Sequence, residues 1–185
     1  MLKIAIILGS TRPGRTGSPV ANWVYEHARQ RTDAEFELVD VAQQNLPLLD
    51  EPLPPSTGQY SKDHTKAWSA KIAPFDGYIF VTAEYNHSVP GALKNAIDFL
   101  YAEWNNKSAG FVSYGSAGGT RVVEHLRGIA AELQLADVRA QVFLPFEDEF
   151  DDDQDFVPTD EATEALTPLF DQVIAWAGAM KTLRS

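Results

Sequence analysis

The sequence contains no cysteine, and cations are the minority among its charged residues. Without cysteine the chain has no disulfide, no thiolate nucleophile and no Cys-ligated metal site, which is compatible with a reducing cytosol. Its 26 Asp and Glu residues outnumber 15 Lys and Arg residues, and the net charge is −11. Such a charge repels polyphosphate backbones, so we do not expect nucleic acid as a partner.

The chain also lacks a long apolar run, and its first residues contain no basic segment followed by an apolar one. We therefore expect neither a signal peptide nor a membrane span, and we predict a cytoplasmic protein. Hydrophobic residues make up 44% and charged residues 22% of the 185 residues, as is typical of globular proteins. No internal repeat or linker interrupts the chain, so we predict one domain over residues 1–185.

Five short apolar or β-branched runs alternate with helical patterns along the chain. The predicted strands cover residues 3–8, 36–41, 77–82, 108–114 and 138–144. Helices are predicted from Ser18-Pro19, over 61–73, from Pro90, over 122–133 and over 166–177, the last beginning or bending at Thr167-Pro168. This alternation predicts a doubly wound α/β fold: a five-stranded parallel sheet of order 2-1-3-4-5 with helices on both faces.

Two segments between these elements have distinctive compositions. Residues 42–59 contain four prolines and are predicted to form a loop, and loops of this length tend to be functional or mobile. Residues 147–155 are acidic except at Phe150 and Gln154, but they lack the ligand spacing and central glycine of a calcium loop. We predict that this acidic segment is a solvated surface loop.

The loop after the first predicted strand, residues 9–18, is rich in small, hydroxylated and cationic residues. Backbone N–H groups at the following helix start, the helix dipole, several hydroxyls and either Arg12 or Arg15 would together form an anion site suited to a phosphate. The alternative is a glycine-rich turn whose hydroxyls only cap the helix.

Two familiar phosphate-binding patterns do not fit this loop. Gly9, Gly14 and Thr16 have the spacing of a Walker A loop, but Arg15 replaces its lysine and no strand ends in a Walker B aspartate. The dinucleotide-binding pattern fails because Thr11 stands where it needs a glycine.

The loop after the third predicted strand carries aromatic, amide and ionisable side chains. Tyr85 offers a flat surface and Asn86 and Ser88 offer hydrogen bonds, a combination that suits a planar heteroaromatic ring. Alternatively, Tyr85 packs in the core and Asn86 forms a turn. Glu84 or His87 has the chemistry to exchange a proton, but no carboxylate is identifiable to orient the histidine, so positioning roles are favoured for both.

Other catalytic arrangements are not found in the sequence. No nucleophile elbow or Ser-His-Asp order can be assembled, and the remaining histidines, His27, His64 and His125, are scattered along the chain. We therefore predict no metal site and name no obligatory catalytic side chain.

Three stretches resemble the NAD(P)H-dependent FMN reductases, flavodoxin-like proteins related to chromate, quinone and azo-dye reductases. They are residues 9–12 (Gly-Ser-Thr-Arg), 84–98 (Glu-Tyr-Asn-His-Ser-Val-Pro-Gly-Ala-Leu-Lys-Asn-Ala-Ile-Asp) and 113–115 (Ser-Tyr-Gly), in matching order within roughly residues 1–140. The second stretch is the most specific of the three. The family commonly has a proline before its Glu-Tyr-Asn triplet, where this chain has Ala83.

The resemblance implies an FMN site and assigns residues to it. The FMN phosphate would be held by Ser10, Arg12, Gly17, Ser18, Pro19 and Val20. The isoalloxazine ring would lie beside Glu84, Tyr85, Asn86 and His87, and its other side would be closed by Tyr114, Gly115 and Ser116.

The same resemblance implies a redox function. NAD(P)H as co-substrate would pass hydride to FMN, and a small-molecule electron acceptor such as free flavin or a quinone would then take the electrons. Members of the family usually form homodimers or homotetramers with the flavin near an interface. Two alternatives remain: a flavodoxin-type electron carrier that does not oxidise NAD(P)H, and a non-catalytic α/β binding module.

Overall fold

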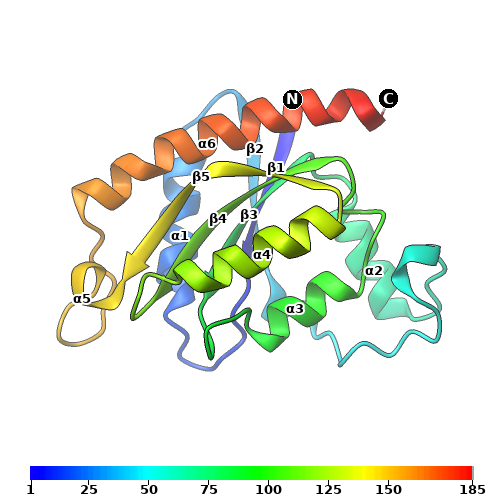
Figure 1. The fold of residues 1–185 in the computed structure, drawn as a ribbon, viewed down its shortest axis with the longest axis horizontal. Helices are drawn as coiled ribbons and strands as arrows, with labels where there is room; N and C mark the ends of the chain where they lie inside the picture. The colour runs from blue at the N-terminus through cyan, green and yellow to red at the C-terminus, as the bar shows by residue number, and fades with distance from the viewer. Residues whose placement is uncertain (185) are drawn as a thin grey trace.

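The computed structural model describes residues 1–184 and contains one five-stranded parallel sheet (Figure 1). The strands are β1 (Leu2–Leu8), β2 (Ala34–Asp40), β3 (Gly77–Ala83), β4 (Lys107–Gly115) and β5 (Leu135–Pro145). They are ordered β2-β1-β3-β4-β5 across the sheet, which confirms the predicted fold and strand order.

Helices cover both faces of the sheet (Figure 1). On one face lie α1 (Gly17–Ala28) and α6 (Asp160–Lys181), and on the other lie α2 (Asp63–Ile72), α3 (Gly91–Asp98) and α4 (Thr120–Glu132). Shorter elements are α5 (Phe146–Glu149) and three 3-10 turns at Val41–Gln44, Pro55–Thr57 and Thr182–Arg184.

The unbroken apolar run of β1 follows from its central place in this sheet. Ile4 and Ile6 point into the core beneath α1 and α6, whereas Ala5 and Ile7 point into the core beneath α2 and α3. Because both faces of the strand are covered, no position alternates to a polar residue. The parallel strands also bring the loops after β1, β3 and β4 to one edge of the sheet.

The helix starts differ from the predictions, by two residues in α2 and α4 and in the following ways in the other three. α1 begins at Gly17, so Ser18-Pro19 lies inside its first turn, and Pro90 is the N-cap of α3 and not its first residue. α6 begins at Asp160 and continues through Pro168, so of the two predicted possibilities a start at Thr167-Pro168 is wrong, and Pro168 lies inside the helix. Its start is set by the hydroxyl of Thr159, which accepts a hydrogen bond from the Ala162 N–H (3.1 Å).

The acidic segment is only partly a solvated loop. Its first residues form α5, and Glu149 is buried with 5% of its surface exposed. The Glu149 carboxylate accepts hydrogen bonds from the Thr159 N–H (2.7 Å) and hydroxyl (2.9 Å), so it fixes the N-cap of α6. Phe150 is also buried, whereas residues 151–155 are exposed as predicted. Acidic composition alone did not distinguish the buried Glu149 from its solvated neighbours.

The proline-rich segment after β2 is tied down at both ends. The Asn95 amide in α3 donates to the Pro47 carbonyl oxygen (2.7 Å) and accepts from the Leu49 N–H (2.9 Å). Further along, Glu51 accepts from the N–H groups of Ser61 (2.8 Å) and Lys62 (2.9 Å). The segment is therefore a hydrogen-bonded loop whose position depends on the Leu-Lys-Asn part of the sequence motif.

Candidate functional site

The loop between β1 and α1 is held in shape by Arg15. Its guanidinium forms an ion pair with Asp40 at the end of β2, and these side chains are only 17% and 12% exposed. Nη1 of Arg15 also donates to the Ser10 carbonyl oxygen (2.6 Å), and Nε donates to the Ser18 hydroxyl (3.0 Å). The rigid fork of the guanidinium allows one side chain to bind three groups at once. Of the two arginines predicted as anion ligands, Arg15 is thus engaged by the loop itself.

Arg12 and the first turn of α1 remain as anion donors in this loop. Arg12 is exposed and has no hydrogen-bond or ion-pair partner within residues 1–184. Thr16 is the N-cap of α1 but its side chain makes no capping hydrogen bond, so the first N–H groups, beginning at Gly17, lack a side-chain acceptor. Pro19 and the buried Val20 complete this turn. The positive end of the helix dipole adds to the attraction for an anion.

The phenol of Tyr114 lies beneath this loop. Tyr114 is 3% exposed, and a Cβ placed on Gly17 would collide with its hydroxyl oxygen. Burial, together with the nearby Tyr85, raises the pKa of Tyr114 to about 12, against a smaller opposing effect of its hydrogen bond with Ser10. The phenol therefore stays protonated at neutral pH and can donate a hydrogen bond. The Tyr114 side chain faces the first loop, so any contact with a ring at the sheet edge falls to its backbone.

The first and third loops touch each other. The Ser10 hydroxyl, buried at 1% exposure, lies 3.4 Å from the Tyr85 hydroxyl. Gly9 packs against Leu93 of α3 so closely that a Cβ at Gly9 would stand 2.8 Å from Leu93 Cδ2. Glycine is needed at this position because the two segments approach each other without room for a side chain.

After β3 the chain makes a tight turn at Tyr85–Ser88. The Tyr85 N–H donates to the Ser88 carbonyl oxygen (3.0 Å), and the Ser88 N–H donates to the Tyr85 carbonyl oxygen (2.9 Å). Between them, Asn86 and His87 both have positive φ, 49° and 64°. This is the conformation of a type I′ turn, and asparagine and histidine are among the non-glycine residues that adopt positive φ most often. The turn projects Tyr85 with 40% of its surface exposed, while Asn86 and His87 are also exposed.

Glu84 serves as a helix cap. Its carboxylate, 6% exposed, forms an ion pair with Arg121 and accepts hydrogen bonds from the backbone N–H groups of Arg121 (3.1 Å) and Val122 (3.3 Å) at the start of α4. Burial raises the pKa of Glu84, but the hydrogen bonds from Arg121 and Val122 outweigh burial and hold the pKa below its usual range. A carboxylate that is ionised and occupied in this way is a poor general base.

We expect Glu84→Gln to lower the free energy of unfolding by about 1 kcal/mol at neutral pH, because the amide cannot serve as a charged cap for α4. The lowered pKa means that the ionised cap stabilises the fold above the ordinary carboxyl pKa and ceases to do so as pH falls through the lowered value. Urea unfolding of the two proteins at neutral and acid pH should therefore show a difference that shrinks with acid. Glu124→Gln, which changes a side chain that is 74% exposed, is the control. Equal stability of Glu84→Gln and the parent protein at neutral pH would contradict the capping role.

The loop after β4 is compact because glycine occupies its critical positions. The Ser113 hydroxyl donates to the Gly118 carbonyl oxygen (2.8 Å), and the Gly118 N–H donates to the Gly115 carbonyl oxygen (2.9 Å). Gly119 has a φ of +70°, and a Cβ there would stand 2.7 Å from Ser113 Cβ. Gly115 is buried and Ser116 is exposed, so the loop presents mainly backbone and one hydroxyl at the sheet edge.

The structure thus brings the predicted site residues to one edge but gives several of them unexpected neighbours. The β1 loop and the β3 turn meet through Ser10 and Tyr85, and the β3 turn meets the β4 loop where the Glu84 N–H donates to the Tyr114 carbonyl oxygen (3.2 Å). Sequence reasoning missed the Arg15–Asp40 clamp. No sequence signal links those two residues beyond their opposite charges, because they are 25 positions apart.

Similarity to known proteins agrees with this arrangement. Residues 2–149 match the family model described as NADPH-dependent FMN reductase. The chain is 41% identical to an NAD(P)H-dependent FMN reductase of Nectria sp over 79% of this chain and 76% of that protein. It is 34% identical to an NAD(P)H:quinone oxidoreductase of Solanum tuberosum over 89% of this chain and 86% of that protein.

A solved structure shows the same fold at low identity. FerB, a flavoenzyme NAD(P)H:(acceptor) oxidoreductase from Paracoccus denitrificans, superposes with a TM-score of 0.75 at 18% identity, covering 97% of this chain and 99% of that one. The flavodoxin-like fold predicted from the resemblance is therefore confirmed. With most of its length matched by the family model and with a 41% identical relative, this chain belongs to the NADPH-dependent FMN reductase family.

Proposed function

We propose that residues 1–185 form one FMN-binding domain that oxidises NAD(P)H and reduces a small-molecule acceptor. The observation that carries this proposal is the meeting of three loops at one sheet edge in a chain of this family: an anion-binding loop after β1, an aromatic turn after β3 and a glycine-rich loop after β4. When bound, FMN supplies the chemistry that accepts hydride from NAD(P)H and releases electrons to the acceptor.

The residues of the first loop fit the FMN phosphate. The uncapped N–H groups at the start of α1 provide donors, and Arg12 provides a positive charge that no residue in 1–184 neutralises. The Ser10 hydroxyl within the loop and the Tyr114 hydroxyl beneath Gly17 would be further donors. The loop is also stiff before any ligand binds, because Arg15 holds both of its ends. Preorganised donors of this kind favour a dianionic phosphate.

The β3 turn and the β4 loop fit a planar ring. Tyr85 is exposed beside the anion-binding loop, and the backbone of Asn86 and His87 is fixed by the two hydrogen bonds of the turn. The Gly115–Ser116 segment would present backbone groups to the other side of the ring. Glu84 positions this region by capping α4, and no side chain of the turn is assigned a proton-transfer role.

The visible spectrum of the purified protein, recorded before and after adding NADPH or NADH, tests the proposal most directly. We expect flavin bands that bleach under anaerobic conditions and return when a quinone or free FMN is added. A protein that carries flavin but is not reduced by either nucleotide would be an electron carrier. A colourless protein that does not bind added FMN would be a binding module of another kind.

Arg12→Ala is expected to weaken FMN binding roughly tenfold, because a charge-assisted hydrogen bond to phosphate contributes about 1.5–3 kcal/mol. Fluorescence titration of the apoprotein with FMN measures the change. Arg29→Ala is a matched control, since Arg29 follows the opposite end of α1 and its side chain is 59% exposed. Unchanged affinity in Arg12→Ala would remove this arginine from the proposed site.

The acceptor that we propose is a quinone or free flavin. The proposal rests on the similarity to proteins named as FMN reductases and as a quinone oxidoreductase. Comparing turnover with each acceptor at saturating NADPH would rank them. The cytoplasmic location and the homodimer or homotetramer remain predictions from the sequence. None of the helices in residues 1–184 combines the length and apolar composition that crossing a membrane requires.

A further inference from the structure

β5 is an edge strand whose two halves differ in regularity and in the side chains that bind their backbone. Among residues 1–184 it pairs with β4 alone. Its register with β4 shifts between Ala109 and Phe111, and near this irregularity Gln172 of α6 accepts from the Ala140 N–H (2.9 Å) and Arg127 of α4 donates to the Val138 carbonyl oxygen (2.9 Å). Among residues 1–184 no side chain forms a comparable bond to the backbone of residues 141–145, and Arg127 reaches only the Gln141 side chain there (3.0 Å). Native proteins usually cover such edges, because unpaired backbone groups are a template for another strand.

The alternation of the backbone shows which groups face outward in this second half. The Tyr114 carbonyl oxygen accepts from the Glu84 N–H, so the next residue back, Ser113, directs its backbone toward β5. Ser113 is in register with Phe143, and in a parallel pair it therefore bonds to the neighbours of Phe143 and not to Phe143 itself. The N–H and C=O of Phe143 and of Gln141 then point away from the sheet. Pro145 is also one of these outward-facing positions. Its missing N–H therefore removes no hydrogen bond to β4.

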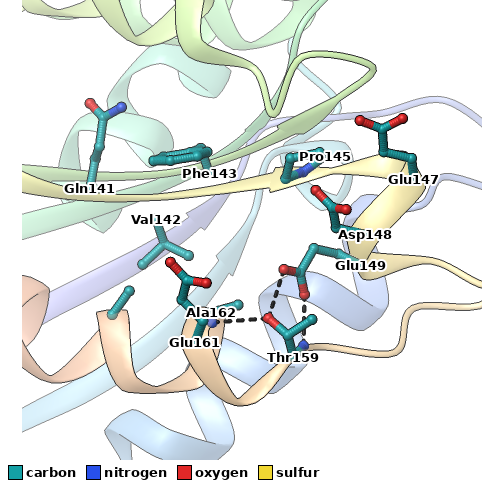
Figure 2. Close-up of a pocket in the computed structure, with 11 residues that line it drawn as sticks. Gln141, Val142, Phe143, Pro145, Glu147, Asp148, Glu149, Thr159, Glu161 and Ala162 are labelled. Carbon is teal, nitrogen blue, oxygen red and sulfur yellow. Dashed lines mark hydrogen bonds between the residues drawn. The ribbon is translucent and has the colours of Figure 1, made fainter.

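A groove of about 620 Å³ lies between this open edge, α5 and the start of α6 (Figure 2). Its apolar lining includes Val142, Pro145, Ala162 and Ala165. Figure 2 shows Phe143 on the strand beside this lining, and 52% of its surface is exposed. The groove thus joins free backbone groups with an exposed aromatic ring.

The polar lining of the groove has one sign of charge. Glu147 and Asp148 in α5 and Glu161 in the first turn of α6 line it, and none has a hydrogen-bond or ion-pair partner within residues 1–184. Glu149 at the back is different, because both of its oxygens bind Thr159, as the dashed lines in Figure 2 show. The nearest unneutralised charges are therefore the three lining carboxylates.

We propose that this groove binds an extended basic segment of a partner protein, which adds as a sixth strand to β5. Backbone hydrogen bonds to Gln141 and Phe143 would give the segment its direction. Apolar side chains on alternate positions would lie on the α6 face of the sheet and cover Val142, Ala162 and Ala165. Lysine or arginine side chains on the other positions would reach Glu147, Asp148 and Glu161. Charge complementarity favours a basic segment over an acidic one. The site is independent of FMN chemistry, so it does not depend on the proposed reductase function.

Fluorescence anisotropy with short synthetic peptides tests this proposal on the intact, flavin-loaded protein. We expect a labelled, end-capped peptide of alternating lysine and valine, about six residues long to match the open edge, to bind and to weaken with added salt. The corresponding glutamate–valine peptide should not bind. Two further lysine–valine peptides carry methyl groups on alternate backbone nitrogens, one on the edge that would face β5 and one on the opposite edge. The first should lose binding, and the second should keep it. Equal binding of the acidic peptide, or of peptides methylated on either edge, would overturn the proposal.

Substitutions test the contribution of the lining carboxylates and that of the strand edge separately. Glu147→Gln, Asp148→Asn and Glu161→Gln together should weaken the basic peptide roughly tenfold, because three rim charges are removed. Asp152→Asn, Asp153→Asn and Glu164→Gln remove the same charge from exposed positions outside the groove and should change the affinity little.

Phe143→Pro, compared with Phe143→Ala, removes the outward N–H in addition to the ring. It should lose more affinity than alanine while leaving flavin reduction unchanged. If the triple variant in the groove binds as tightly as its control, the proposed site is wrong. If Phe143→Pro fails to fold, the methylated peptides still decide whether the edge is used.

Discussion

Gly17→Ala is expected to weaken FMN binding at least roughly tenfold and to lower the free energy of unfolding by about 1–3 kcal/mol. The added Cβ would collide with the Tyr114 hydroxyl and stand 2.9 Å from Leu8 Cδ1. Both neighbours are buried in the core beneath α1, with 3% of each exposed, so neither can move aside cheaply. The start of α1 must shift outward, and its N–H groups then leave the positions at which they would bind a phosphate.

The double variant Gly17→Ala/Tyr114→Phe shows whether the collision causes the loss. Removing the hydroxyl makes room for the new methyl group, so the double variant should regain part of the FMN affinity relative to Tyr114→Phe alone. Gly128→Ala is the control, because a Cβ at this helical glycine meets no atom within 4 Å. That control should be neutral or slightly stabilising, since alanine favours a helix over glycine by about 1 kcal/mol. Full FMN affinity in Gly17→Ala would contradict the assigned role of the α1 start.

The sheet was predictable because burial on both faces leaves a direct trace in the sequence. The run from Lys3 to Leu8 is apolar without alternation, which is what a parallel strand between two helical layers requires. Helix starts were less predictable because they depend on contacts made after folding. Ser18 has the residue type of an N-cap, yet its hydroxyl binds Arg15, and the helix begins at Gly17, two residues before the start that a Ser18 N-cap would give. In the same way Glu149 looks like its acidic neighbours, and only the position of Thr159 shows why it is buried.

The candidate site was predictable in position but not in its internal bonding. Loops after parallel strands meet at the carboxyl edge of a sheet, so the convergence of the β1, β3 and β4 loops follows from topology. Topology does not predict which residue each charged side chain pairs with. Glu84 pairs with Arg121 across 37 positions, and this contact changes the interpretation of Glu84 from a candidate base to a helix cap. A single sequence shows opposite charges at many pairs of positions and does not show which pair meets.

Contacts of α3 connect the segments around the candidate site, and the sequence alone does not show them. Leu93 in α3 packs on Gly9, so the helix that follows the β3 turn also shapes the start of the β1 loop. Asn95 in the same helix holds the segment after β2 through Pro47 and Leu49. These contacts fix α3, the β1 loop and the segment after β2 relative to one another. This interdependence is a physical reason for the motif to continue from the turn into α3.

Arg15→Ala is expected to lower the free energy of unfolding by about 3 kcal/mol, because it leaves the mostly buried Asp40 carboxylate without its cation. It should also weaken FMN binding, since the Ser10 carbonyl oxygen and the Ser18 hydroxyl lose the donors that hold the loop. Urea unfolding of the apoprotein measures the first effect and FMN titration measures the second. Arg29→Ala, which breaks an ion pair whose side chains are 59% and 53% exposed, should change stability by less than about 1 kcal/mol.

The double variant Arg15→Ala/Asp40→Asn distinguishes the two consequences of losing this arginine. Neutralising Asp40 removes the unpaired buried charge, so the double variant should regain much of the stability that Arg15→Ala lost. It restores neither donor to the β1 loop, so its FMN affinity should stay as low as that of Arg15→Ala. If stability and FMN affinity recover together, the ion pair contributes to binding only by keeping the protein folded. If stability alone recovers, Arg15 orders the phosphate-binding loop through Ser10 and Ser18.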